Sequence, residues 1–162
     1  MKPVFKAFIV VLIALAANVQ AFAHCEVPCG IYNDQLRIEL IKEHITTIEK
    51  AMKQIEELSA AEEVNYNQLV RWINTKEHHA DLIQEITEQY FMTQRIKAVD
   101  PADEAAYKRY ISQLTLAHEM LVLAMKTKQS TDVAVTDKLL KTVDKFSEAY
   151  FDEKELDHGH QH

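Results

Sequence analysis

Apolar residues recur along most of the chain at spacings of three and four, the period of an amphipathic α-helix. The first such segment covers residues 35–58 and carries one apolar stripe with charged residues between its members. A second segment runs to about Val99. It begins either at Ser59, which has Glu62 three residues later as in a capping box, or by Asn65. The stripe of the first segment consists of Ile38, Ile41, Ile45, Ile48, Met52 and Ile55.

Two further helical segments follow a break at Asp100-Pro101. Aspartate followed by proline suits an N-cap and the first turn of a helix, so we expect the third helix to begin there. Polar residues 127–132 then connect it to a fourth helix. Short connections between four such helices predict an all-α fold, an antiparallel up-down four-helix bundle. The apolar positions are Tyr107, Ile111, Leu114, Leu121 and Met125 in the third helix and Val135, Leu139, Val143, Phe146 and Tyr150 in the fourth.

The composition agrees with an all-helical chain. Only 2 Gly and 3 Pro occur in 162 residues, which argues against sandwiches, barrels and Gly-rich nucleotide-binding sheets, because these folds need many tight turns. The formal net charge is -7 and the sequence has no block rich in Lys and Arg. We therefore expect no nucleic-acid partner.

Residues 1–23 have the features of a secretory signal peptide. Two lysines precede an apolar run at residues 7–17, and small residues stand three residues and one residue before the expected cut after Ala23. The run is shorter than the about 20 apolar residues that a membrane-spanning helix needs. We therefore expect a signal peptidase to cut after Ala23. The mature domain, residues 24–162, would then be exported to the periplasm or the extracellular space without a membrane anchor.

Cleavage at that bond would place both cysteines of the chain at a new N-terminus. The sequence HCEVPC would begin with the free amine and imidazole of His24, followed by a backbone amide and two thiols. An amine, an amide nitrogen and two thiolates can close a square plane, the geometry that Ni(II) and Cu(II) prefer. Pro28 restricts the backbone before Cys29, and Gly30 allows an unusual backbone angle after it. The alternative is a disulfide between Cys25 and Cys29, as expected in an oxidising compartment.

The stretch HCEVPCGIY, residues 24–32, closely resembles the nickel hook of nickel-containing superoxide dismutases, whose mature chains begin His-Cys-x-x-Pro-Cys-Gly-x-Tyr. The motif is highly specific because it combines six fixed positions with an N-terminal location. Over the rest of the chain the resemblance lies in the four-helix architecture, with a looser similarity around residues 67–71, 76–77 and 90–91.

The resemblance implies one nickel ion per subunit and a metal-binding hook at the N-terminus of the bundle. Its ligands would be the His24 amine, the Cys25 amide and the thiolates of Cys25 and Cys29, with the His24 imidazole axial in the oxidised state. Tyr32 would stand over the open face of the metal, Pro28 would be cis, and the subunits would form a homohexamer. The implied activity is disproportionation of superoxide to O2 and H2O2 through a Ni(III)/Ni(II) cycle, with His24 and Tyr32 as the catalytic residues.

Three positions around the hook differ in how well they match this family. Glu26 stands where the family often has aspartate. In the family a glutamate on the first helix and an arginine on the second hold the axial imidazole. Glu39 matches the surroundings of that glutamate, whereas His79 occupies the position of the arginine. We therefore expect different hydrogen bonding around the metal.

Other charged and histidine positions have weaker functional signals. Removing the two lysines of the leader makes the mature chain still more acidic, so superoxide would have to be attracted by cations close to the hook. Arg37, Lys42 and Lys76 are the candidates. His118 lies on the apolar stripe of the third helix, where we expect a hydrogen-bonded core histidine.

The C-terminal segment 157–162 carries His158, His160 and His162, which could capture a divalent metal or be inert. This leaves two alternatives to the dismutase. One is a secreted nickel- or copper-binding helical protein without turnover, and the other is a helical protein closed by a disulfide.

Overall fold

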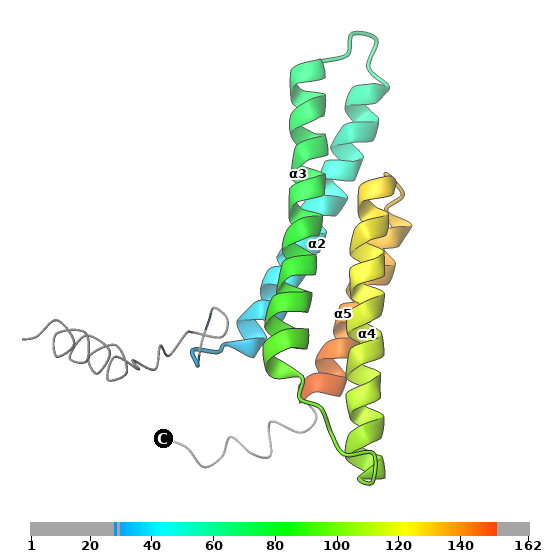
Figure 1. The fold of residues 1–162 in the computed structure, drawn as a ribbon. Coiled ribbons are helices and arrows are strands. Elements are labelled where there is room, and N and C mark those ends of the chain that lie inside the picture. The colour runs from blue at the N-terminus through cyan, green and yellow to red at the C-terminus, as the bar shows by residue number, and fades with distance from the viewer. Residues whose placement is uncertain (1–27, 29, 152–162) are drawn as a thin grey trace, which may run out of the picture.

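The computed structural model describes residue 28 and residues 30–151 of the chain (Figure 1). Within this part the chain is helical and has no strand, which confirms the predicted all-α class. The π-helix η1 continues α3, and α3 and η1 together take the place of the second predicted helix. The elements are α2 (Asp34–Ser59), α3 (Tyr66–Glu85), η1 (Ile86–Arg95), α4 (Glu104–Gln129) and α5 (Ala134–Phe151).

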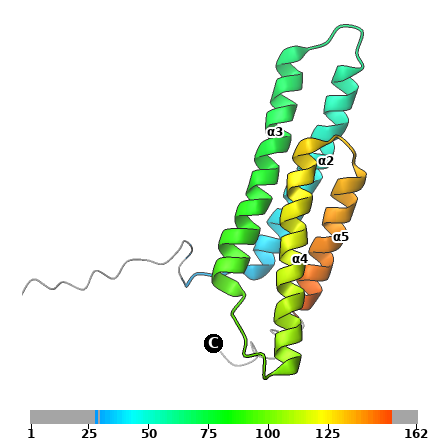
Figure 2. The ribbon, with the colours of Figure 1, turned by 45° about the vertical axis from the view of Figure 1, so that its right-hand side comes forward.

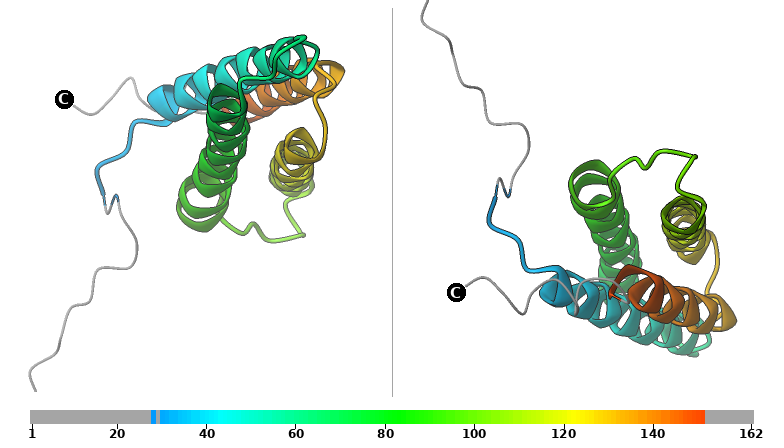
Figure 3. Two further views of the ribbon diagram at one scale, coloured as in Figure 1. Left: turned by 90° about the horizontal axis from the view of Figure 1, so that it is seen from above. Right: turned by 90° about the horizontal axis from the view of Figure 1, so that it is seen from below.

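The helices form an antiparallel up-down bundle, as predicted. Helices that follow one another along the chain pack together, and α5 closes the bundle by packing on α2 (Figures 2 and 3). The α2–α3 hairpin extends beyond the α4–α5 connection at one end of the bundle (Figure 1). The hook joins the bundle at the other end, where α2 begins.

The core contains the predicted stripe of α2. All six of its predicted apolar residues are buried. At the end of the bundle where α2 begins, aromatic rings complete the core. Phe91 lies edge-on to Phe146 and to Tyr150, with ring centres 5.1 and 5.2 Å apart. Such edge-to-face pairs add stability beyond the apolar area that they bury.

Helices α2 and α3 begin at asparagine N-caps. Asn33 accepts a hydrogen bond from the amide of Leu36 at 3.0 Å, and Asn65 accepts one from the amide of Gln68 at 3.2 Å. The start by Asn65 is therefore the correct one of the two predicted. The capping box at Ser59 is wrong, because Ser59 is the last residue of α2.

The predicted start of the third helix is wrong by three residues. Its N-cap is Asp103, whose carboxylate accepts from the amide of Ala106 at 3.1 Å. Asp100 instead closes a turn around Pro101. Its side chain accepts from the amide of Ala102 at 2.9 Å, and its carbonyl accepts from the amide of Asp103 at 3.0 Å. Asp100 and Asp103 can each accept from a nearby backbone amide, and the sequence pattern alone favoured Asp100 as the N-cap.

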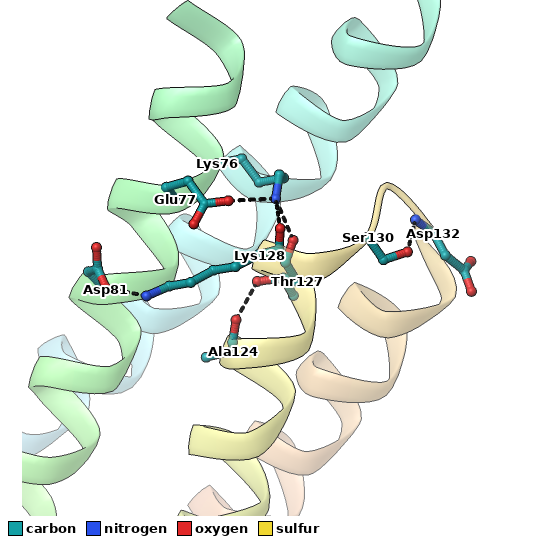
Figure 4. A network of polar contacts seen from close by, with 8 residues as sticks. All are labelled: Lys76, Glu77, Asp81, Ala124, Thr127, Lys128, Ser130 and Asp132. Carbon is teal, nitrogen blue, oxygen red and sulfur yellow. Dashed lines mark hydrogen bonds and ion pairs between the residues drawn. The ribbon is translucent and has the colours of Figure 1, made fainter. Parts of the chain in front are cut away.

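Helix α4 also ends later than predicted, because residues 127–129 belong to it rather than to the connection. Thr127 is buried and its hydroxyl donates to the carbonyl of Ala124 at 2.7 Å. Lys76 of α3 donates through Nζ to the carbonyl of Thr127 at 2.9 Å and also to that of Lys128, as Figure 4 shows. Lys76 thus satisfies carbonyl groups that the end of a helix leaves without a partner.

The predicted apolar stripe of α4 is displaced from its buried face. Ile111 and Met125 are 38% and 41% exposed. His118 is exposed as well, so the prediction of a core histidine is wrong. The stripe was predicted from large apolar side chains, whereas the buried face of α4 includes two alanines. The buried residues of α4 are Ala117, Met120, Leu123, Ala124 and Thr127.

Candidate metal centre and its support

The hook is described only in part, namely at residue 28 and from residue 30 onward. Gly30 has a φ of 76°, in the left-handed region that favours glycine, which agrees with the unusual backbone angle expected there. The predicted nickel ligands stay predictions. The residues of the predicted hook that lie outside the described part include His24, Cys25, Glu26 and Cys29.

The carboxylate of Asp34, in the first turn of α2, gathers three side chains from η1 and α5. The hydroxyl of Tyr90 donates to Oδ1 at 2.6 Å, and the hydroxyl of Tyr150 donates to Oδ2 at 2.8 Å. Arg95 donates to the same two oxygens through Nε and Nη2, both at 2.9 Å. Two parallel bonds of this kind are among the strongest contacts of a carboxylate. Together, the contacts of Asp34 fix the start of α2 against η1 and α5. Asp34 lies two residues after Tyr32.

The π-helical register explains how Tyr90 and Arg95 reach the same carboxylate. In an α-helix, residues five apart point about 140° away from each other. The i to i+5 pattern of η1 brings such residues close to one face of the helix. Asp34, Arg95 and Tyr150 were not predicted as functional residues. The α-helical period does not place Tyr90 and Arg95 together, and Asp34 and Tyr150 lie far from them in the sequence.

Tyr32, predicted to stand over the metal, packs on this cluster. The guanidinium carbon of Arg95 lies 4.1 Å from the centre of the Tyr32 ring, and the ring of Tyr90 meets it edge-on at 5.9 Å. Arg37 lies over the other aromatic ring, with its guanidinium carbon 5.0 Å from the centre of Tyr90. Tyr32 remains 39% exposed, so part of its side chain stays accessible at this end of the bundle.

Burial and Asp34 set the charge states within the cluster. Burial, reinforced by the hydrogen bond to Asp34, raises the pKa of Tyr90 to about 12. The same causes raise the pKa of Tyr150 well above its usual range. Burial lowers the pKa of Arg95, but the hydrogen bond to Asp34 and the neighbouring charges outweigh it, so the pKa rises overall. At neutral pH both phenols are therefore protonated and Arg95 is a cation.

Glu39 and His79, the two positions expected around the axial imidazole, have separate partners. Glu39 is exposed and accepts from the side-chain amide of Gln35 at 3.2 Å. Nδ1 of His79 lies 3.0 Å from Nδ1 of His44, so one ring donates and the other accepts. Neither of these hydrogen bonds joins Glu39 to His79. His44 was missed from the sequence because nothing in its spacing links it to a residue of α3.

Burial lowers the pKa of both paired histidines. The pKa of His44 is lowered by burial and further by His79, with Glu43 opposing. The pKa of His79 is lowered by burial and by His78, again with Glu43 opposing. Both rings are therefore mostly neutral at pH 7, so each keeps an acceptor nitrogen for a hydrogen bond within the pair.

The three candidate cations for attracting superoxide have different surroundings. Lys42 is partly exposed and pairs with Asp144 of α5 at 2.7 Å. Arg37 contacts Tyr90 of the cluster beside Tyr32. The prediction for Lys76 is wrong, because its side chain is 5% exposed and binds the end of α4. Arg95, which the sequence analysis did not select, is a cation in contact with Tyr32.

The described residues contain neither a cluster of metal-binding side chains nor a membrane-spanning helix. Among them no group of three or more His, Cys, Asp and Glu side chains is arranged to hold a metal ion. No helix in this part of the chain is long and apolar enough to cross a membrane.

Comparison with protein families gives one match. The family described as nickel-containing superoxide dismutase matches residues 19–154, which is most of the chain and includes the whole predicted hook. Comparison with curated proteins and with solved structures gives no match.

Proposed function

Because the chain belongs to the nickel-containing superoxide dismutase family, we propose that its metal centre is the hook of residues 24–32, completed by cleavage after Ala23. The protein is a nickel-dependent oxidoreductase that disproportionates superoxide to O2 and H2O2. The observation that carries the proposal is the motif HCEVPCGIY inside the matched residues.

The donor set fits nickel chemically. The His24 amine, the Cys25 amide and the thiolates of Cys25 and Cys29 provide two nitrogen and two sulfur ligands, and the His24 imidazole can add a fifth. Bound nickel supplies a one-electron redox couple, which superoxide can both reduce and reoxidise. The sulfur ligands must be thiolates rather than a disulfide, since only the thiolate binds metal.

The described residues support the hook through Tyr32. Asp34 orients Arg95 with two hydrogen bonds, and Arg95 packs on the Tyr32 ring. Tyr32 is thereby held at one position relative to α2 while 39% of its surface stays exposed. In the proposed centre the Tyr32 ring would restrict access to the bound metal to small ligands, while the charge of Arg95 beside it is balanced by Asp34.

The test of the centre is a single added residue. The mature chain beginning at His24 is compared with a chain that keeps Ala23, after loading both with nickel. We expect one nickel per subunit and full dismutase activity only in the mature chain, because Ala23 turns the amine of His24 into an amide. A chain ending at residue 156 is the matched control, since it removes the histidine tail and leaves the hook intact. Equal activity with Ala23 retained would contradict the proposed ligand set.

The axial imidazole has its own test. His24→Gln keeps the amine at the N-terminus and removes the ring. We expect it to retain nickel and lose most of its turnover. Loss of nickel in proportion to turnover would instead make the imidazole a ligand that holds the ion.

We also propose a homohexamer, for which the α2–α3 hairpin offers contact surface. Tyr66, Val70 and Ile73 follow one another along α3 and are 72%, 52% and 37% exposed. They lie in the first half of α3, which begins at Tyr66, and Ile73 lines a cavity together with Ser130 and Thr131 of the α4–α5 connection. We expect Val70→Glu to shift the mass seen by analytical ultracentrifugation toward smaller assemblies. Asn74→Glu, at an exposed polar position of the same helix, should leave it unchanged. An unchanged mass in Val70→Glu would contradict a contact there.

Export is the last part of the proposal. The features of residues 1–23 support a signal peptide, so signal peptidase would both release the protein and create the amine of His24. N-terminal sequencing of the protein recovered from a periplasmic or culture-supernatant fraction tests this, with His24 as the expected first residue. A chain recovered there that still begins before His24 would contradict it.

A further inference from the structure

Helix α4 carries an apolar stripe on the side turned away from its core residues. At about 100° per residue, Ile111, His118 and Met125 point about 140–180° away from the buried Met120. Ile111 and Met125 are 38% and 41% exposed, and His118 is exposed in the separate subunit. The stripe also includes the half-buried side chains of Tyr107, Leu114 and Leu121. The packing of α4 on α3, η1 and α5 therefore leaves this outer stripe only partly covered.

The outer stripe has the heptad spacing of a coiled coil. Its members follow one another at alternating steps of four and three residues from Tyr107 to Met125. The same spacing reaches Glu104 before the stripe and Lys128 after it. A stripe of this period stays on one side of a helix that crosses a second helix at a shallow angle. The spacing therefore indicates a helix as the partner of this face.

The pattern of the stripe reads the same in both directions, which suits pairing with a second copy of the chain. It is symmetric about residue 116, so an antiparallel copy places each member opposite another member. In a twofold contact, residue i of one copy meets residue j of the other, and j meets i. The layers formed in this way, each of them twice, are Tyr107 against Met125, Ile111 against Leu121, and Leu114 against His118.

The two ends of the stripe are complementary in charge. The same register places the exposed Glu104 of one copy opposite Lys128 of the other, at both ends of the contact. The side chain of Lys128 is 25% exposed and also pairs with Asp81 of α3 in its own subunit. An ammonium group has three donors, so Lys128 can serve both carboxylates. A parallel pair would instead bring like charges together at each end, which disfavours that arrangement.

We propose that two copies of the protein pair antiparallel along the outer stripes of α4. The contact would remove Ile111 and Met125 from water, and this burial drives the association. The symmetry of the pattern favours a second copy, because a different partner would not need it. This pairing rests on the homohexamer proposed above and deepens it. A twofold contact of one kind closes at two copies, so six copies need a further contact, such as the one proposed on α3.

The first test is sedimentation velocity of the nickel-loaded protein over a range of concentrations, with Ile111→Glu as the variant. We expect at least about tenfold weaker association, because each pair would bury two carboxylates against Leu121. Leu140→Glu is the matched control, since Leu140 is also 38% exposed but lies on α5. Circular dichroism checks that both variants fold. Unchanged association in Ile111→Glu overturns the proposal, and so does equal weakening in Leu140→Glu.

Two charge variants test the register and leave the apolar layers intact. Glu104→Lys and Lys128→Glu each bring like charges together at both ends, so each alone should associate at least about twofold more weakly. An equal mixture of the two should associate as tightly as the wild type, because every mixed pair again has opposite charges at both ends. No recovery on mixing overturns the antiparallel pairing. The readout is the mass of the assembly, so failure of the pairing is distinguishable from loss of nickel or of dismutase activity.

Discussion

Arg95 lies over Tyr32, with its guanidinium carbon 4.1 Å from the centre of the ring. The same guanidinium is fixed by two hydrogen bonds of 2.9 Å to Asp34, which also accepts from Tyr90 and Tyr150. The end of the hook is therefore tied to three helical elements through one carboxylate. A substitution of Asp34 should therefore lower the stability of the bundle and alter the position of Tyr32.

We expect Asp34→Ala to destabilise the protein by about 3 kcal/mol, the lower end of the cost of removing one partner from a buried ion pair, because this pair is partly buried. Arg95 would stay charged and partly buried while two phenols lose their acceptor. The measurement is denaturant unfolding followed by circular dichroism.

Asp137→Ala is the control for this prediction. Asp137 occupies the first turn of α5 as Asp34 occupies that of α2, but it is exposed. It should cost under about 1 kcal/mol, as expected of an acidic residue near a helix N-terminus. Equal costs for the two variants would show that the Asp34 contacts add little.

Two substitutions at Tyr32 separate its ring from its hydroxyl. Tyr32→Phe keeps the contact with Arg95, so its stability should match the wild type. Tyr32→Ala should lose about 0.5–1 kcal/mol, the range of a cation–π contact at an exposed site. Thermal unfolding measures this difference. Superoxide turnover by pulse radiolysis on the same samples shows whether removing the ring changes access to the metal, and a less stable Tyr32→Phe would contradict the stacking role.

The sequence was sufficient for the parts of the fold that depend on large apolar side chains at regular spacing. The stripe of α2 is buried as predicted, from Ile38 to Ile55. The prediction failed where the deciding residues were small or polar. Ala117 and Ala124 form part of the buried face of α4, which leaves Ile111 exposed.

For the site, the sequence identified Tyr32 and the hook motif but not the cluster that holds Tyr32. Asp34 and Arg95 are 61 positions apart. They meet only because η1 changes register and the bundle brings its end beside the start of α2. A local pattern cannot contain such a contact, and the same holds for His44 with His79.

The pair of His44 and His79 predicts a stability that falls in acid. Their pKa values are lower in the folded protein than the ordinary 6.5, so the unfolded chain binds protons first as the pH drops. Stability is therefore complete above about pH 6.5 and declines below it, by at most about 1.4 kcal/mol per pH unit for each histidine. Urea unfolding between pH 5 and pH 8 measures the slope.

His44→Gln should reduce that slope, because one titrating ring is removed and the other loses its neighbour. His118→Gln is the control at an exposed position and should leave the slope as in the wild type. A slope unaffected by His44→Gln would mean that other groups cause the acid sensitivity.

Substitution of Lys76 tests whether this lysine stabilises the fold or attracts superoxide. Its Nζ donates to the buried Thr127 carbonyl at 2.9 Å and to the partly exposed Glu77 at 2.9 Å, so Lys76→Met removes the donor from a buried carbonyl. We expect a loss of about 1–3 kcal/mol in unfolding free energy. Lys53→Met, at an exposed lysine paired with Glu49 on α2, should cost less than about 0.5 kcal/mol. Because Lys76 is buried, the salt dependence of kcat/KM for superoxide should be the same in Lys76→Met as in the wild type. A weaker salt dependence in Lys76→Met than in Lys53→Met would show instead that Lys76 attracts the substrate.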